Sequence, residues 1–524
     1  MLNLAFGWIW ITMGFVAGAV LGMGFHKDEF MGGYNSWARR LTRLGHIAFF
    51  GTGFLNVLVG LTGLLFGESY LDAPIWTWIS ISFLLGGCWM PICCFVVAVK
   101  KEAKTIFVIP VVLLTVGFVE RSEVIASLPS LGLLTLAALT PDDIEISYHE
   151  VDDLQRDRVP DLGFDLVAIS TMTAQAFDAY TLADEFRASG ITVVMGGLHA
   201  TCVPDECMQH ADAVVVGEGE SVWARLIEDF RKGQLQPKYE SDDSYSLDDA
   251  PMPRFDLLDI DKYNRLTVQT TRGCPHKCDF CASSIMLTPS YKVKPTHKVI
   301  EEIRAIKSIW DDPFIELADD NSFASRGRAY ELLEAMIPER VRWFTECDVS
   351  IARDPTLLSL MERAGCRQVL IGLESPNETG LDGIETNNNW KLAQYPKYEE
   401  AVRTIQSHGI TVIGCFVLGL DGHTPATFDA VYDFAERTNL YDVQVTLQTP
   451  FPGTPLYHRL EDSGRLTHAG QWDRCTLFDL NYEPIGMTRD ELESGFRDLV
   501  SRIYDPKFIK RRQLGFLKQL RSVG

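Results

Sequence analysis

Three cysteines, Cys274, Cys278 and Cys281, stand close together with the spacing C-x3-C-x2-C, and this run constrains the chain more than any other feature. Three thiolates suit a 4Fe-4S cluster that leaves one iron without a protein ligand, because fully ligated clusters use four cysteines. An open coordination position can bind a substrate or a cofactor, as it does in catalytic zinc sites. The spacing therefore predicts a reactive cluster rather than a purely structural one.

Three other sites use similar cysteine patterns: a zinc knuckle, a thioredoxin-like pair at Cys278 and Cys281, and half of a ferredoxin. Zinc and ferredoxin sites need a fourth ligand nearby, whereas Cys347 and Cys366 are distant in the sequence. A thioredoxin-like pair has no use for Cys274. We therefore favour the open cluster.

With Gly273 before it and Phe280 beside its third cysteine, the motif resembles the signature of the radical S-adenosylmethionine (radical SAM) superfamily. The resemblance implies that SAM binds the open iron through its amino and carboxylate groups. It further implies that an electron from a low-potential donor, such as flavodoxin or ferredoxin, cleaves SAM to a 5'-deoxyadenosyl radical. The expected core is a partial (β/α)6 TIM barrel with Phe280 beside the cofactors.

Composition limits the class of protein. A chain of 524 residues is long enough for three or four domains of about 150 residues each. The formal net charge of −22 argues against a nucleic-acid partner, because such proteins usually present a basic face. The 12 cysteines form no compact even framework, which suits a reducing cytoplasm.

Three segments without Asp, Glu, Lys or Arg are each about the ~20 residues needed to cross a bilayer: Leu4–Phe25, Ile47–Gly67 and Ile75–Val99. Basic residues follow the first and third segments, and acidic residues lie between the second and third. Because basic loops stay inside, we expect a multi-pass protein of the cytoplasmic membrane, with a three-span region over 1–103 and catalytic domains on the cytoplasmic side. Gly14, Gly18 and Gly22 share one helical face and favour close packing, either among the spans or between two chains.

Residues 104–240 alternate short apolar runs with helical stretches, which predicts a flavodoxin-like, doubly wound (Rossmann-type) α/β domain. The expected strands are Thr105–Ile109, Ile144–Tyr148, Leu166–Ser170, Thr192–Met195 and Ala213–Val216. Ligands of such sheets bind beyond the carboxyl ends of the strands. The residues at those ends are Ser170, Thr171, Gly196, Gly197, His199, Gly217 and Glu218.

Ser130–Ala138, the Gly-Gly-x-His-Ala-Thr run and the Gly-Glu-Gly-Glu run resemble the cobalamin-binding domain that precedes the radical SAM core in one branch of the superfamily. The resemblance implies that these strand-end residues contact cobalamin. The Asp-x-His-x-x-Gly motif, whose histidine replaces the lower cobalt ligand, is missing from the sequence. His199 either orders the Gly-Gly turn by hydrogen bonding or lies beside the cofactor, and a domain kept for packing without cobalamin is a further alternative.

A linker rich in Asp, Ser and Pro, 241–262, leads to the predicted barrel, 263–465. The expected strands of the barrel are Leu266–Thr270, Phe314–Leu317, Trp343–Thr345, Val369–Gly372, Thr411–Leu418 and Val443–Leu447. Barrel active sites lie at the carboxyl ends of strands. The resemblance implies SAM contacts there, from Asp319, Asp320, Asn321, Glu346, Glu374, Ser375 and Gly419. The run beginning at Asp319 could instead cap the helix near Ser325.

The tail, 466–524, resembles the helical C-terminal extension of a hopanoid-methylase-like subgroup through Trp472, Met487, Thr488 and Tyr504. Together these resemblances imply a radical SAM enzyme that uses cobalamin as a methyl carrier to an unactivated carbon. The three apolar segments and the basic residues beside them add the expectation of a membrane anchor and of a small-molecule, lipid-like substrate. Two alternatives stay open. One is oxidative cyclisation or rearrangement without methyl transfer, and the other is a membrane electron-transfer or sensing protein.

Overall fold

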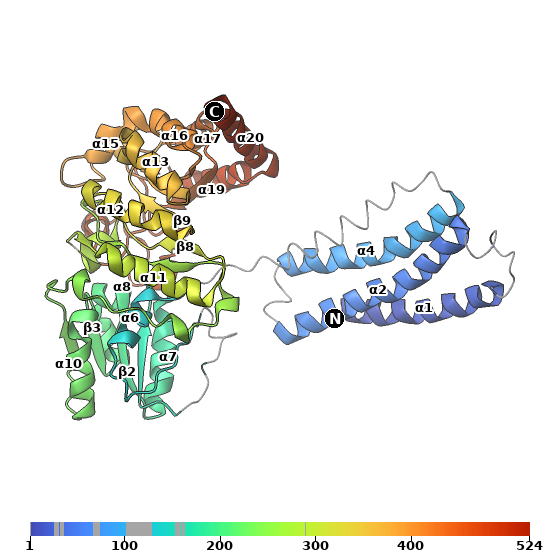
Figure 1. Ribbon diagram of the computed structural model, residues 1–524, viewed down its shortest axis with the longest axis horizontal. Coiled ribbons are helices and arrows are strands. Elements are labelled where there is room, and N and C mark those ends of the chain that lie inside the picture. The colour runs from blue at the N-terminus through green and yellow to red at the C-terminus, as the bar shows by residue number, and fades with distance from the viewer. Residues whose placement is uncertain are drawn as a thin grey trace. The chain divides into compact units, whose positions relative to one another are not determined.

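The computed structural model describes residues 2–25, 31, 36–66, 74–100, 128–151, 159, 163–288 and 290–523 (Figure 1). It consists of two compact units, Met1–Ala126 and Ser127–Gly524. The predicted strand Thr105–Ile109 lies outside the described residues.

The first unit contains three long helices, α1 (Leu2–Phe25), α2 (Trp37–Phe66) and α4 (Pro74–Val99). Small residues let α1 approach α2, as the sequence suggested: a side chain at Gly14 would meet Phe49 and Phe50, and one at Gly18 would meet His46. Asn56 ties the helices together through buried hydrogen bonds. It accepts from Asn3 at 2.8 Å and donates to the Phe83 carbonyl at 3.0 Å.

Two stretches of these helices, Asn3–Leu21 and Ser80–Ala98, are apolar and long enough to cross a membrane. A signal sequence and the core helix of a soluble protein also meet this criterion, so the finding is weak evidence. The predicted span at Ile47–Gly67 is not among these two stretches of the described part of the chain. The three-span topology therefore stays a prediction.

In the second unit, the first domain has a four-stranded parallel sheet of order β1-β2-β3-β4. Alternate residues of β2 face opposite sides: Val193 and Met195 pack toward α7 and α9, whereas Val194 packs toward α10. The strands are β1 (Leu166–Ser170), β2 (Thr192–Gly196), β3 (Ala213–Val216) and β4 (Lys238–Glu240). The helices are α6 (Leu131–Leu139), α7 (Ala176–Ala188), α8 (Gly197–Cys202), α9 (Pro204–His210) and α10 (Glu220–Arg231).

Three of the predicted strands of this domain are confirmed, and the prediction for Ile144–Tyr148 is wrong. That segment adopts no regular secondary structure in the described residues, although its residues alternate as those of a strand do. A strand requires a neighbour that pairs with its backbone, and this segment belongs to none of the sheets of the described residues. It is held through a side chain instead: the Tyr148 hydroxyl donates to Glu150 at 2.9 Å and accepts from the Ser130 amide at 2.7 Å.

The second domain has a six-stranded parallel sheet of order β12-β11-β10-β9-β8-β5, which confirms all six predicted barrel strands. Their bounds are β5 (Leu266–Val268), β8 (Phe314–Leu317), β9 (Arg342–Cys347), β10 (Cys366–Glu374), β11 (Thr411–Leu418) and β12 (Asp442–Leu447). The helices of this part are α11 (Thr296–Ile309), α12 (Arg326–Met336), α13 (Pro355–Arg363), α14 (Glu378–Leu381), α15 (Trp390–Gln394), α16 (Tyr398–Ser407) and α17 (Ala426–Thr438).

A short hairpin, β6 (Thr271–Arg272) and β7 (Lys292–Val293), follows β5 and brackets the cysteine motif. The C-terminal extension supplies α18 (Pro455–Asp462), α19 (Arg489–Ile503) and α20 (Pro506–Val523). Of these, α19 packs on α17 and α20 packs on α16, against the outside of the barrel (Figure 1).

Candidate active site

The loop that begins the cysteine motif is held by Asp319, which follows β8. Its carboxylate accepts from the Thr270 and Thr271 amides at 2.7 and 2.8 Å and from Ser322 Oγ at 2.6 Å. The side chain is buried, and these donors use both of its oxygens. Asp319 is therefore a brace for the cluster loop, and this use of the Thr270 amide explains why β5 ends at Val268.

Asp320 and Asn321 continue this bracing. Asp320 accepts from the Gly273 amide at 2.9 Å and from Ser283 Oγ at 2.5 Å. Asn321 Nδ2 lies 3.9 Å from Cys274 Sγ and donates to Asp348 Oδ2 at 2.9 Å. Asp348 in turn lies 3.3 Å from Nε2 of His276, inside the motif.

The three cysteines fit a cluster site. Burial raises the pKa of Cys278 to about 12, and the neighbouring Cys281 and Cys274 contribute to the rise, so the thiols lie within each other's electrostatic reach. Ser284 Oγ donates to Cys281 Sγ at 3.3 Å, the kind of contact that tunes a cluster's potential. The described residues contain no three-ligand group for a single metal ion. A cluster spreads its thiolates over different irons, so that finding does not conflict with it.

At the end of β10, Glu374 has a left-handed backbone with φ 62° and accepts from Lys391 Nζ at 2.6 Å. Lys391 also lies near Cys278 and partly offsets the cost of a thiolate there. The neighbouring Ser375 hydroxyl lies 3.0 Å from His423 Nε2. The Gly419 carbonyl accepts from the Tyr482 hydroxyl at 2.6 Å, and Phe280 packs against the barrel core.

A cavity of about 500 Å³, a usual size for ligand sites, lies between the strand ends of the two domains. The four-stranded domain contributes five of the predicted residues to its lining: Ser170, Gly196, Gly197, Gly217 and Glu218. The barrel contributes Asp319, Asp320 and Glu346. Residues predicted from two separate domains thus meet at one cavity.

Glu346 has an unusual electrostatic environment on the barrel side of this cavity. Burial, and then the carboxylates of Glu316, Asp320, Asp319 and Glu374, raise its pKa to about 7. A carboxyl group in this state can hold or release a proton near neutral pH.

Two predicted residues of the four-stranded domain do not line the cavity. Thr171 is buried beside it, and His199 is completely buried in α8. His199 Nε2 lies 2.8 Å from the Tyr180 hydroxyl, and burial lowers the pKa of the imidazole to about 4. Tyr180 belongs to α7, and Nδ1 of His199 is buried without a hydrogen-bond partner among the described residues, so neither interpretation of His199 is decided.

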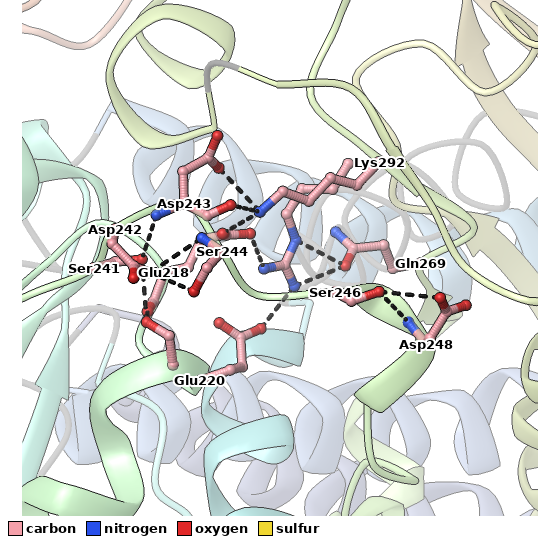
Figure 2. Close-up of polar contacts among 12 residues, drawn as sticks. Glu218, Glu220, Ser241, Asp242, Asp243, Ser244, Ser246, Asp248, Gln269 and Lys292 are labelled. Atoms are coloured by element: carbon pink, nitrogen blue, oxygen red, sulfur yellow. Dashed lines mark hydrogen bonds and ion pairs between the residues drawn. The ribbon is translucent and has the colours of Figure 1, made fainter.

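Several charged residues that the sequence analysis did not single out surround Glu218 (Figure 2). Arg272, two residues before Cys274, donates to Glu218 at 2.9 Å and to Glu220 at 2.7 Å. Lys292 forms a further ion pair with Glu218 and lies 2.9 Å from Asp243. Only two features of the sequence pointed to this network. Arg272 stands beside the motif, and the Gly-Glu-Gly-Glu run contains two carboxylates.

Family models match three parts of the chain. The radical SAM superfamily model matches residues 268–435, which include the cysteine motif and all barrel strands except the first and last. Residues 268–435 therefore form a radical SAM domain. The B12-binding domain model matches 122–227, and a domain of unknown function, DUF4070, matches 454–523. The cofactors of this radical SAM enzyme are accordingly a 4Fe-4S cluster, SAM and cobalamin.

Its relatives include methyltransferases. A bacteriochlorophyllide d C-12(1)-methyltransferase of Chlorobaculum tepidum is 29% identical over 394 residues, which are 74% of this chain and 84% of that protein. A hopanoid C-2 methylase of Rhodopseudomonas palustris is 26% identical over 405 residues, 74% of each chain.

Among solved structures, the radical SAM methyltransferase TsrM of Kitasatospora setae, with cobalamin and a 4Fe-4S cluster bound, aligns with a TM-score of 0.58. The alignment covers 77% of this chain and 97% of TsrM at 16% identity. This likeness supports the two-domain fold of the radical SAM enzyme described here.

Proposed function

We propose that this enzyme is a cobalamin-dependent methyltransferase that methylates an unactivated carbon of an apolar substrate. The observation that carries the proposal is the single cavity lined by strand-end residues of both domains. When bound, the cofactors supply a carbon-centred radical from SAM and a methyl group from cobalamin. The three cysteines do not line this cavity, but Arg272 and Ser283 on either side of the motif do, so a substrate held there would lie beside the cluster loop and the cobalamin-side loops.

In this proposal the chain's own residues hold the reacting groups in place. Cys274, Cys278 and Cys281 carry the cluster on the loop braced by Asp319 and Asp320. Lys391 supplies a positive charge beside Cys278. Glu346 is the candidate proton carrier of the cavity, because its pKa of about 7 lets it exist in both protonation states at neutral pH.

On the cobalamin side, we propose that the loops at Ser170, Gly197 and Gly217 face the corrin. Glycines with left-handed backbones, φ 90° at Gly197 and 80° at Gly217, shape these loops. The proposed domain bounds are 104–240 for the cobalamin domain, 263–465 for the barrel and 466–524 for the extension. A low-potential donor such as flavodoxin or ferredoxin would supply the electron.

We also propose that the enzyme acts at the cytoplasmic face of a membrane on a lipid-like substrate. The first unit exposes many large apolar side chains, among them Trp8, Phe15 and Phe54, each more than half exposed. Soluble proteins rarely leave so much apolar surface uncovered. The two relatives are named for acting on a bacteriochlorophyllide and a hopanoid, and a substrate of similar apolar character fits this location.

One experiment tests the methyl-transfer proposal. The full chain is purified anaerobically, its cluster is reconstituted, and corrinoid and iron are quantified. Candidate apolar substrates are then incubated with SAM that carries a deuterated methyl group. We expect one corrinoid per chain and a labelled product. A product without the label indicates cyclisation or rearrangement, and a chain that takes up no corrinoid overturns the proposal.

A further inference from the structure

Arg272 joins the two cofactor-binding domains. It stands in β6, two residues before the first cysteine, and its guanidinium binds Glu218 and Glu220 at 2.9 and 2.7 Å. Glu218 lies in the loop between β3 and α10 of the cobalamin-binding domain, and Glu220 is the first residue of α10. One side chain of the cluster loop is therefore clamped by two side chains of the other domain.

The opposite strand of the hairpin is held in the same way. Lys292 in β7 pairs with Arg272 in the β6–β7 register, and its ammonium group binds Glu218 and, at 2.9 Å, Asp243. The four side chains Arg272, Lys292, Glu218 and Glu220 expose between 2% and 17% of their surface. Buried ion pairs of this kind add little net stability, because desolvation offsets their attraction, and their best-attested use is to specify one arrangement.

The chain between Arg272 and Cys274 has little freedom to absorb a displacement. Gly273 has φ 80°, and a side chain there would come within 2.4 Å of the Ser290 carbonyl. Its amide is held by Asp320 at 2.9 Å. Arg272 and Cys274 are therefore joined by a short and constrained stretch of the chain.

We propose that Arg272 is a positioning residue that fixes the cluster loop on the cobalamin-binding loop and so sets the separation of the two cofactor sites. The proposal rests on the proposed function, because it needs cobalamin to matter to the reaction. Arginine suits this task because its planar guanidinium reaches two carboxylates at once, which a lysine ammonium group cannot do equally well.

The ion pairs of Arg272 with Glu218 and Glu220 form the proposed clamp. Two variants of the full chain test it from both sides: Arg272→Lys, and the double change Glu218→Gln with Glu220→Gln. Glu228→Gln is the matched control, because Glu228 lies on the same helix as Glu220 and forms an exposed ion pair with Lys232. Hydrogen exchange is measured on the cofactor-free protein. We expect about tenfold faster exchange of the Thr270, Thr271 and Gly273 amides in both variants, as loss of a charge-assisted hydrogen bond allows, and wild-type rates in the control.

The decisive measurement is the exchange rate of the cluster-loop amides in the variant whose changes lie in the other domain. If the Glu218/Glu220 double variant loosens only its own loop and leaves the cluster loop at wild-type rates, the clamp does not position the cluster loop and the proposal is overturned. This measurement needs no bound cofactor, so it decides the clamp even if the wild type takes up no corrinoid, a result that would sink only the proposed function.

A second readout tests the separation of the sites. Cob(II)alamin and the reduced cluster each carry an unpaired electron, and their magnetic interaction falls with the cube of their distance. We expect Arg272→Lys to keep its iron and corrinoid. By electron paramagnetic resonance, its magnetic interaction should be weaker and should reflect a broader range of distances between the two sites, while Glu228→Gln matches the wild type. An interaction in Arg272→Lys identical to that of the wild type contradicts the proposal.

Discussion

At the scale of single residues, Glu346 shows how a cavity between acidic strand ends raises the pKa of a carboxyl group. Its folded pKa of about 7 lies above the ordinary 4.5, because burial and the neighbouring carboxylates disfavour its charge. The folded protein therefore binds this proton more tightly than the unfolded chain. The contribution of Glu346 to stability falls as pH rises from about 4.5 to about 7 and stays at the lower level above that.

We predict that Glu346→Gln is more stable than the wild type at pH 8, and that this advantage shrinks as pH falls to 5. The shift corresponds to a difference on the order of 2–3 kcal/mol between the two ends of the range. Thermal unfolding of the cofactor-free protein at both pH values measures it. Glu362→Gln, an exposed position on α13, is the control, and an equal offset at both pH values contradicts the prediction.

Each cysteine of the motif is predicted to be essential for the cluster. Replacement of Cys274, Cys278 or Cys281 with Ala leaves two thiolates, which do not hold the cluster stably, so iron content and 5'-deoxyadenosine formation should both fall to background. Cys415→Ala on β11 should keep both, because it changes a cysteine outside the motif. Full iron content and SAM cleavage in a triple Ala variant would falsify the assignment.

Residue types at strand ends were predictable from the sequence, but the partners of these side chains were not. Asp319, Asp320 and Glu346 were expected at the carboxyl ends of barrel strands, and they line the cavity. That Asp319 uses both oxygens on the cluster loop follows from packing between segments far apart in the sequence. Lys391, which pairs with Glu374, carried no sequence signal, because a lone lysine in a helical stretch is usually exposed.

At the scale of elements, the junction between β2 and α8 should decide corrinoid binding. Gly197 has φ 90°, and a side chain there would come within 2.8 Å of Ser170 Oγ. We predict that Gly197→Val lowers corrinoid uptake at least several-fold and leaves the iron-sulfur absorption intact, since the cysteines lie in the other domain. Gly233→Val is the control, with φ 66° but no atom within 4 Å of the added carbon. Equal corrinoid loss in both variants would show that backbone strain alone is responsible.

The C-terminal extension binds both domains, which gives a structural role to the DUF4070 segment. Trp472 donates to Glu206 of α9 at 2.8 Å and packs edge-on against His199, while Tyr482 binds the barrel at Gly419. We predict that Trp472→Ala destabilises the cobalamin domain by about 3 kcal/mol, and Trp472→Phe by about 1 kcal/mol, because Phe keeps the packing and loses only the hydrogen bond. Thermal unfolding compares the two, and equal losses would contradict the packing argument.

Long elements with clear periodicity were predictable, and short ones were not. The six barrel strands and β1 to β3 lie where apolar runs predicted them, with ends shifted by a few residues. The short β4 and the β6–β7 hairpin gave no pattern, since two or three residues show no period. Ile144–Tyr148 has the pattern without the strand, because pairing depends on a neighbour that the pattern does not reveal.

At the scale of the whole molecule, charge is distributed unevenly. The chain has a net charge of −22, yet α20 contains six basic residues and no acidic one. Seven exposed residues recur every three or four positions and form one stripe along this helix: Lys507, Lys510, Arg511, Leu514, Leu517, Lys518 and Arg521. Basic residues interspersed with leucines suit the anionic surface of a membrane, consistent with the proposed location.

We predict that a chain beginning at Lys100, without the apolar helices, binds vesicles containing phosphatidylglycerol but not vesicles of phosphatidylcholine alone. Replacing Lys507, Lys510, Lys518 and Arg521 with Glu should abolish this binding, because each basic residue contributes about 1 kcal/mol near an anionic surface. Arg328→Glu on α12, an exposed position of the same shortened chain, is the control and should bind normally. Sedimentation at low and high salt measures the effect, and salt should weaken it. Binding that survives the charge reversal would show that α20 does not contact the membrane. If the stripe instead binds an acidic protein such as flavodoxin and no vesicles, the stripe is a binding surface for the electron donor.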